Sequence, residues 1–248
     1  MQMDFVFNKF HYSNYNLRYN TIINLTFTFI LILASFSFLS LHYVKEAKRL
    51  AWMISLLNSF IMSVIGMFYI IYKIDDVIKI IVTGSSGRDI FHGLDNISAI
   101  ACLWFGLANA ADLIFGCIYY HKEQGLLTAY FHHSIFIWIM LTCTTGNGII
   151  LNCVPFAPSF LFMCIEEIPT FLLALGTVNK ALRSDLGFGI FFFIFRLVYH
   201  AMFLFLSVYY RADKVVSFLY TLTFTMHVYW FYGWYSKYGK NLTKKIKI

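Results

Sequence analysis

Charged side chains are scarce in this chain, at 12% of its 248 residues, whereas an ordinary soluble domain carries about 25%. Hydrophobic residues make up 60% of the chain and aromatic residues 20%. Many stretches of about 20 residues carry no charge, and that length crosses the hydrocarbon layer of a bilayer. The composition therefore excludes a soluble globular fold and a sizeable water-soluble domain.

Proline and cysteine are also few, and their positions exclude further architectures. The three prolines, Pro155, Pro158 and Pro169, share one apolar stretch, where each removes a backbone donor and favours a kink. The five cysteines lie inside apolar stretches rather than in loops. Such positions give no reason to expect a disulfide framework.

The apolar stretches predict the fold. A helix rises about 1.5 Å per residue, so about 20 residues cross a hydrocarbon layer about 30 Å thick. We predict an all-α polytopic membrane bundle with about seven transmembrane helices. The predicted spans are residues 21–42, 50–72, 96–120, 126–145, 148–178, 186–210 and 215–238. The fifth holds all three prolines, which favours a broken helix, and residues 73–95 are expected to form the only extended polar loop.

The excess of basic residues gives a formal net charge of +7, which could reflect nucleic-acid binding or membrane orientation. Most of these residues lie in short segments beside the apolar stretches, as expected where Lys and Arg set the orientation of a membrane protein. Seven spans place 11 of them on the side of the C-terminus and 7 on the other side. The sequence therefore predicts a cytosolic C-terminus and no nucleic-acid partner.

Several predicted spans contain ionisable or strongly polar side chains, which are costly to place in a bilayer and usually mark function. One interpretation is a polar chamber in the cytosolic half of the membrane, where burial and neighbouring charges adapt carboxylates and imidazoles to acid–base work. The other is structural, with an arginine neutralising buried carboxylates. The residues, in chain order, are Asn58, Asp112, His132, His133, Glu166, Glu167, Arg196, His200 and His227.

Helix geometry and spacing narrow the chemistry of these residues. Adjacent residues on a helix point about 100° apart, so His132 and His133 cannot both face the chamber fully. The same limit holds for Glu166 and Glu167, whereas Arg196 and His200 are four apart and share a face. Histidine with carboxylate can bind iron or zinc, but the chain lacks the repeated boxes of spaced histidines that mark membrane di-iron enzymes. We therefore predict no metal and no resident cofactor.

Short motifs follow one another on successive predicted spans. They are Asn109-Ala110-Ala111-Asp112-Leu113-Ile114, Phe131-His132-His133-Ser134-Ile135, Glu167-Ile168-Pro169-Thr170-Phe171-Leu172, Phe195-Arg196 and Tyr229-Trp230-Phe231. In this order they resemble the TLC-domain family, which includes the ceramide synthases and the translocating-chain-associating membrane proteins. The resemblance covers residues 45–240, leaving residues 1–44 as an N-terminal segment with the first span and residues 241–248 as a basic tail. The chain is most similar to small TLC-domain proteins of the transmembrane-56 type.

The resemblance implies a multi-pass protein of the endoplasmic reticulum or another internal membrane, with membrane lipids and a second copy of the chain as partners. It would act in lipid metabolism or lipid homeostasis. In an enzyme, His132 or His133 would serve as base or nucleophile, oriented by Asp112 or Glu167. The residues expected to bind lipid or balance charge are Asn58, Glu166, Arg196, His200 and His227.

Two classes of activity remain open. The first is a lipid acyltransferase, such as a ceramide-synthase-like N-acyltransferase with acyl-CoA as cosubstrate. The second is a non-catalytic lipid regulator, transport receptor or chaperone. In the ceramide synthases an acidic run follows the His-His pair, and this chain instead continues from His133 with an apolar segment at residues 135–140.

Overall fold

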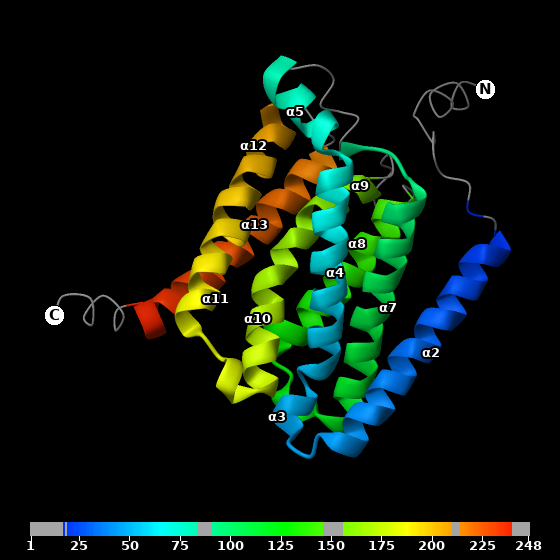
Figure 1. Ribbon diagram of the computed structural model, residues 1–248, viewed down its shortest axis with the longest axis vertical. Helices are drawn as coiled ribbons and strands as arrows, with labels where there is room; N and C mark the ends of the chain where they lie inside the picture. Colours follow the sequence, from blue (N-terminus) through cyan, green and yellow to red (C-terminus); the bar gives the residue numbers. More distant parts are fainter. Residues whose placement is uncertain (1–16, 18, 84–90, 146–155, 210–213, 240–248) are drawn as a thin grey trace.

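The computed structural model describes residues 17, 19–83, 91–145, 156–209 and 214–239, and these residues are almost entirely helical (Figure 1). Across these ranges no β-strand occurs, and one isolated bridge pairs Gly93 with Phe156. Five helical stretches are long and apolar enough to cross a membrane. They are Asn20–Tyr43, Ala47–Tyr72, Asn96–Tyr119, Ala157–Val178 and Asp185–Tyr209. The prediction of an all-α membrane protein is confirmed to this extent.

The helices nearly coincide with the predicted spans. The longer elements are α2 (Tyr19–Tyr43), α4 (Met53–Tyr72), α7 (Asn96–Tyr119), α8 (His132–Thr145), α10 (Glu167–Val178), α12 (His200–Tyr209) and α13 (Lys214–Trp234). The shorter helices are α3 (Ala47–Leu50), α9 (Ala157–Met163) and α11 (Asp185–Phe192). Residues 148–155 of the fifth predicted span, and the basic tail at residues 241–248, lie outside the described residues.

The prediction of one long polar loop at residues 73–95 is wrong in its first half. Residues Ile74–Thr83 form the helix α5, which follows α4 after Lys73. Its first turn holds Asp75 and Asp76, whose carboxylates interact favourably with the positive end of the helix dipole. Apolar residues recur at helical spacing between these charges, so the segment forms an amphipathic helix rather than a loop.

Short 3-10 and π-helical segments connect or interrupt the helices. The 3-10 segments are η1 (His121–Glu123), η3 (Cys164–Glu166) and η4 (Lys180–Leu182). The π-helical segments are η2 (Leu126–Phe131), η5 (Phe193–Tyr199) and η6 (Tyr235–Gly239). Single π-helical turns within helices occur frequently at functional sites. Here η2 ends directly before His132, and η5 contains Arg196.

The fifth predicted span is broken, as its prolines favoured. Helix α9 ends at Met163, η3 follows, and α10 begins at Glu167. Pro169 cannot donate a backbone hydrogen bond to the carbonyl of Ile165, and its ring conflicts with that carbonyl. The tightened turn lies directly before the proline and carries Glu166. Pro169 therefore explains why the backbone departs from α-helical geometry at Glu166, a predicted site residue.

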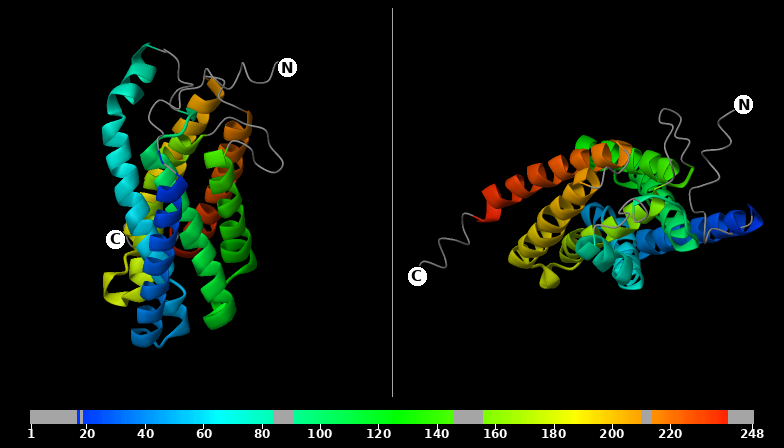
Figure 2. Two further views of the ribbon diagram at one scale, coloured as in Figure 1. Left: turned by 90° about the vertical axis from the view of Figure 1, so that its right-hand side faces the viewer. Right: turned by 90° about the horizontal axis from the view of Figure 1, so that it is seen from above.

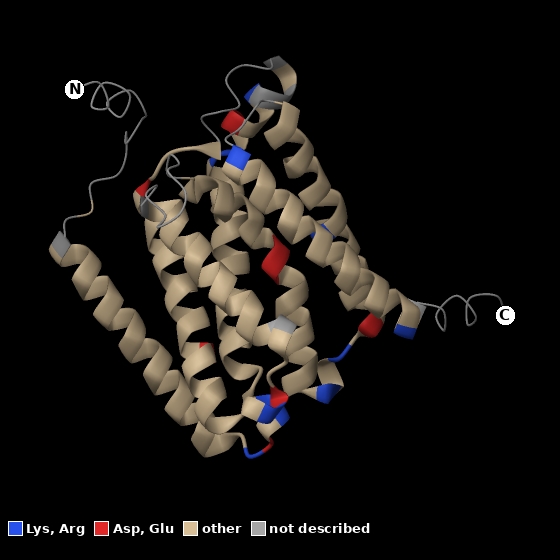
Figure 3. Cartoon of the chain, turned by 180° about the vertical axis from the view of Figure 1, so that it is seen from behind, with Lys and Arg blue, Asp and Glu red and all other residues tan. Residues whose placement is uncertain are grey.

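The helices form a bundle in which α4 packs on α10 and α7 packs on α8. Helix α2 contacts α7 and α4 from the periphery, and its N-terminal half diverges from the bundle (Figures 1 and 2). Close approach of α4 to η3 requires Gly66, because a Cβ there would lie 2.8 Å from the Ile165 nitrogen. Charged residues gather at the ends of the bundle, with few along its middle (Figure 3).

Candidate functional site

A cavity of about 440 Å³ lies inside the bundle between α4, α7, α8, α10, η5 and α13. We call this cavity the chamber. Its walls combine apolar and aromatic side chains with polar groups that come from separate helices. Six of the predicted site residues line it: Asn58, Asp112, His132, His133, Glu167 and Arg196. Distant parts of the sequence thus bring carboxylates, imidazoles and a guanidinium to one space.

Asp112 is the most extensively bonded carboxylate of the chamber. His133 Nδ1 lies 3.4 Å from Asp112 Oδ2, and the Tyr120 hydroxyl donates a hydrogen bond to Asp112 Oδ1. The side-chain amide of Gln124 donates to the Asp112 backbone carbonyl at 3.1 Å. A carboxylate beside Nδ1 favours the tautomer that carries its proton there, which leaves Nε2 of the imidazole as a base.

The turn after α7 places Tyr120 and Gln124 beside Asp112. Helix α7 ends at Tyr119, and η1 reverses the chain so that Gln124 returns against Gly116. A Cβ at Gly116 would lie 1.8 Å from the Gln124 amide nitrogen, so glycine is what makes room for this contact. Sequence reasoning missed Tyr120 and Gln124. The position of Tyr120, two helical turns after Asp112, is the only signal, and it is a weak one.

The two adjacent histidines have different surroundings. Both rings border the chamber, but His133 contacts Asp112, whereas the His132 ring packs 4.6 Å from the Phe136 ring and 5.5 Å from the Trp230 ring. The two rings therefore differ in their partners, a carboxylate for His133 and aromatic rings for His132. His133 is therefore the better placed of the two for acid–base chemistry.

Arg196 connects η5 to η3 and α10 in the wall of the chamber. Its Nε donates to the Glu166 carbonyl at 2.9 Å, and its Nη2 donates to Thr170 Oγ1 at 2.6 Å and lies 3.6 Å from Glu167 Oε1. Its guanidinium also lies 5.9 Å from the centre of the Trp230 ring, within the range of a cation–π contact. Glu167 therefore pairs with Arg196, whereas the His133 imidazole contacts Asp112.

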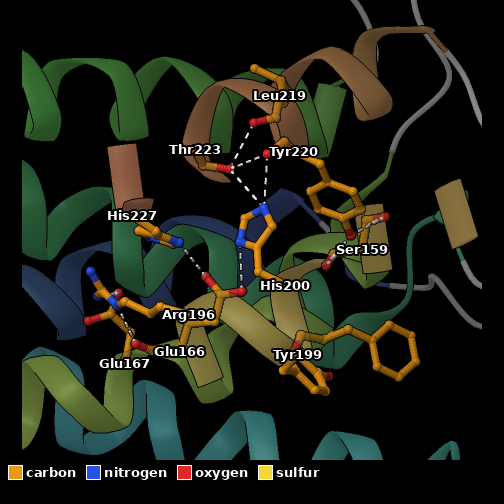
Figure 4. Close-up of polar contacts among 11 residues, drawn as sticks. Ser159, Glu166, Glu167, Arg196, Tyr199, His200, Leu219, Tyr220, Thr223 and His227 are labelled. Atoms are coloured by element: carbon orange, nitrogen blue, oxygen red, sulfur yellow. Dashed lines mark hydrogen bonds and ion pairs between the residues drawn. The ribbon is translucent and has the colours of Figure 1, made fainter. Parts of the chain in front are cut away.

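A second group of predicted site residues lies around a smaller cavity of about 70 Å³. His200 Nδ1 lies 2.8 Å from Glu166 Oε1, and His227 Nδ1 lies 3.6 Å from Glu166 Oε2 (Figure 4). All three side chains are buried. We call Glu166, His200 and His227 the buried triad. The expectation of one chamber for all these residues is corrected to two cavities.

The two cavities share a wall. His132, Glu167 and Arg196 line both of them. The adjacent carboxylates point to different partners, Glu167 to Arg196 and Glu166 to the two imidazoles. This division follows from the angle of about 100° between neighbouring helical side chains.

No protein-family model, curated protein or solved structure matches this chain.

Further polar groups hold the buried triad in place. His200 Nε2 lies 2.9 Å from the Tyr220 carbonyl oxygen and 3.4 Å from Thr223 Oγ1. The Tyr220 hydroxyl in turn donates to Ser159 Oγ at 3.1 Å (Figure 4). Sequence reasoning missed these three residues. Serine, threonine and tyrosine are common in membrane helices, so only the packing of α9, α12 and α13 identifies them.

Proposed function

We propose that this chain is a polytopic membrane protein of the TLC type that binds a lipid with its polar head in the chamber. The observation that carries the proposal is the Asp112–His133 pair on the wall of a cavity between apolar helices. A volume of about 440 Å³ falls within the roughly 300–1,000 Å³ of small-molecule sites. The apolar lining suits acyl carbons, and the polar groups suit hydroxyl, amine or carbonyl groups.

The topology that accompanies this proposal has seven spans. To the five long apolar helices it adds η2 with α8 and α13 with η6, which occupy the fourth and seventh predicted spans. These two carry the intramembrane histidines His132, His133 and His227, which makes them more polar. An odd number of spans with the observed Lys and Arg distribution supports a cytosolic C-terminus. We place the protein in the endoplasmic reticulum or another internal membrane.

Within the chamber, His133 acts as general base in the proposed mechanism. Asp112 holds the imidazole with Nδ1 toward the carboxylate, and Tyr120 holds Asp112. The imidazole then removes a proton from a lipid hydroxyl or amine as that group attacks the thioester carbonyl of acyl-CoA, the cosubstrate. The new ester or amide bond forms as the carbon–sulfur bond breaks, and the imidazolium returns the proton to the departing coenzyme A thiolate. The Glu167–Arg196 pair contributes polar contacts to the head group. The reaction class is acyl transfer to a lipid.

A second candidate is a non-catalytic lipid regulator or transport receptor. The apolar run at residues 135–140 after the His-His pair favours it, because this run takes the place of the acidic run of ceramide synthases. In this case the chamber binds the same class of lipid, and the Asp112–His133 pair contacts the head group without proton transfer.

Lipid mass spectrometry separates these functions. Cells expressing the wild type, His133→Ala, Asp112→Asn or the control His121→Ala are compared at matched membrane abundance, together with the lipids that co-purify with each protein. His121 lies in the exposed η1 turn, so its replacement removes a histidine without reaching the chamber. Catalysis predicts that His133→Ala and Asp112→Asn abolish a lipid change that His121→Ala retains.

The other outcomes are equally specific. A non-catalytic role predicts that Asp112→Asn and His133→Ala lose a lipid that co-purifies with the wild type, while no acylated lipid depends on any of the four proteins. If all four proteins give the same cellular lipids and the same co-purified lipids, the chamber does not bind lipid and the proposal is wrong.

A further inference from the structure

The buried triad brings three ligand-type atoms to one point from three segments. Glu166 belongs to η3, His200 begins α12, and His227 lies in α13. One oxygen of Glu166 and one nitrogen from each imidazole all lie within 4.8 Å of one another. Glu166 Oε1, His200 Nδ1 and His227 Nδ1 are buried, and the two nitrogen–oxygen contacts among these side chains do not have hydrogen-bond geometry. Buried polar atoms are seldom left in this state, and three of them around one point favour a shared partner.

The tautomer of His200 shows what kind of partner is needed. Its Nε2 faces the Tyr220 carbonyl, which only accepts, so Nε2 carries a proton. In a ring with this single proton, Nδ1 has a lone pair that faces the Glu166 carboxylate at 2.8 Å. Two acceptors at this distance repel each other unless a positive species lies between them. His227 Nδ1 directs a third ligand-type atom to the same carboxylate.

Histidine spacing alone predicted no metal, but the triad brings its ligands together from separate segments. We propose that Glu166, His200 and His227 bind one divalent transition-metal ion, and that Zn²⁺ is the ion that suits these donors best. A shared proton bridges only two of the three atoms, whereas a metal ion interacts with all three. Two imidazoles with one carboxylate are a common ligand set for Zn²⁺ in sites that keep a fourth position for water. The same set also suits Fe²⁺.

The dimensions of the triad are close to those of a zinc site. Zn²⁺ bonds to histidine nitrogen and carboxylate oxygen at about 2.0–2.2 Å, which places tetrahedral ligand atoms about 3.3–3.6 Å apart. The distance from His227 Nδ1 to Glu166 Oε2, 3.6 Å, matches that range, and the distance from His200 Nδ1 to Glu166 Oε1, 2.8 Å, is shorter. The adjoining cavity of about 70 Å³ also exceeds the roughly 30 Å³ that one water molecule occupies in the liquid.

The surrounding groups match the outer shell of a metal site. Metal-binding histidines usually donate their second ring N–H to a carbonyl or carboxylate, which fixes the tautomer. His200 makes such a contact with the Tyr220 carbonyl. The positive charge of the nearby Arg196 disfavours binding of a metal ion. The Glu167 carboxylate, 3.6 Å from the Arg196 guanidinium, reduces this repulsion. Glu166 therefore keeps its carboxylate for the ion.

This site is separate from the lipid-binding proposal, although the two cavities share His132, Glu167 and Arg196 as a wall. Its test uses the full chain purified in detergent without chelator, incubated with Zn²⁺ and freed of excess ion. Inductively coupled plasma mass spectrometry then gives the zinc content per chain. We expect a single bound Zn²⁺ ion in the wild type, and a raised unfolding temperature that a chelator reverses.

Variants locate the ion. We expect Glu166→Gln, His200→Ala and His227→Ala to lower Zn²⁺ affinity by more than the about 10–100-fold effect of losing an outer-shell partner. His132→Ala serves as the matched control, because this histidine lines the same cavity but is not one of the three ligands. Size-exclusion profiles identify variants that fold.

A second experiment uses the wild type alone. Co²⁺ bound in place of Zn²⁺ should give the ligand-field absorption bands of a four-coordinate site.

Two results would overturn the proposal. One is a wild-type chain that retains no more Zn²⁺ than the variant with all three ligands replaced and shows no Co²⁺ bands. The other is bound Zn²⁺ that the folded ligand variants retain as well as the His132→Ala control. Neither result depends on lipid binding or lipid chemistry, so the failure of this proposal is distinguishable from the failure of the proposed function.

Discussion

The chamber and the buried triad contain the same types of side chain but arrange them in opposite ways. Around the chamber, Asp112, His133 and the Glu167–Arg196 pair border a space of about 440 Å³. In the triad, Glu166 and two imidazoles turn toward one another beside about 70 Å³. The first arrangement is suited to an organic ligand with a polar head. The second is suited to a single ion.

This difference shows two ways in which one membrane bundle accommodates charge. Ionisable groups in a bilayer need a partner, a polar cavity or a function. Around the chamber, the ionisable groups have protein partners and also border a cavity. In the triad, the groups have only one another and the neighbouring polar atoms. Loss of one member should therefore cause more damage in the triad than in the chamber.

The largest effect is expected from Glu166→Ala. This change leaves two buried imidazoles, those of His200 and His227, without their carboxylate, and each buried polar group left unpaired costs about 1–3 kcal/mol. The free energy of unfolding can be measured by titrating the detergent-solubilised protein with a denaturing detergent. Glu46→Ala is the control, since Glu46 pairs with Arg49 in an exposed contact. Equal unfolding free energies of the two variants would contradict the expected difference between the buried triad and an exposed ion pair.

Tyr120→Phe should have the next largest effect on stability. It removes the hydroxyl that donates to the Asp112 carboxylate and preserves the ring. Hydrogen bonds to charged groups contribute about 1.5–3 kcal/mol, so we expect a loss within that range and below that of Glu166→Ala. The same unfolding titration measures it. Tyr119→Phe, at an exposed residue one position earlier, controls for the loss of a hydroxyl. If Tyr120→Phe lost more unfolding free energy than Glu166→Ala, the chamber would be more sensitive than the triad, opposite to the expected order.

Gly66→Ala tests whether the position of η3 supports the triad. The added Cβ would meet the backbone of Ile165 and the Cβ of Cys164 at less than 3 Å, and such overpacking typically costs about 1–3 kcal/mol. Because η3 carries Glu166, we also expect weaker Zn²⁺ binding than in the wild type. Gly233→Ala is the matched control, with no atom within 4 Å of its added Cβ. Unchanged Zn²⁺ content in Gly66→Ala would show that η3 does not position the site.

The smallest effect is expected from Asp185→Ala at the start of α11. Arg183 Nη2 lies 2.9 Å from Asp185 Oδ1, but both side chains are exposed. Exposed ion pairs contribute only about 0.2–1 kcal/mol, so the unfolding free energy should change by no more than this. A greater loss, measured beside Glu166→Ala in the same titration, would show that surface charge matters as much to this bundle as buried charge.

The positions of the helices could be predicted because long apolar runs leave few alternatives in a membrane. The break before Pro169 could also be predicted, since proline removes a specific backbone hydrogen bond. The helix α5 was missed because the charges at residues 75, 76 and 79 obscured its apolar face. Composition therefore located the five long apolar helices well and the amphipathic helix α5 poorly.

The candidate site could be predicted as a set of residues but not as a set of contacts. Intramembrane charges identified Asp112, His133 and the triad, because their burial has a high energetic cost. Their pairing depends on helix rotation, and the π-helical segments η2 and η5 change that rotation beside His132 and at Arg196. The sequence gives no clear signal for these segments. The angle of about 100° between neighbours predicts that Glu166 and Glu167 face different ways, but not which partners each one meets.

The most direct test is an experimental map of the full chain in lipid nanodiscs. We expect Asp112 and His133 to contact each other on the wall of a cavity that holds the head of a lipid, and Glu166, His200 and His227 to converge on one point beside it. If these side chains instead lie apart, facing acyl chains or bulk water, neither site exists and both proposals are wrong.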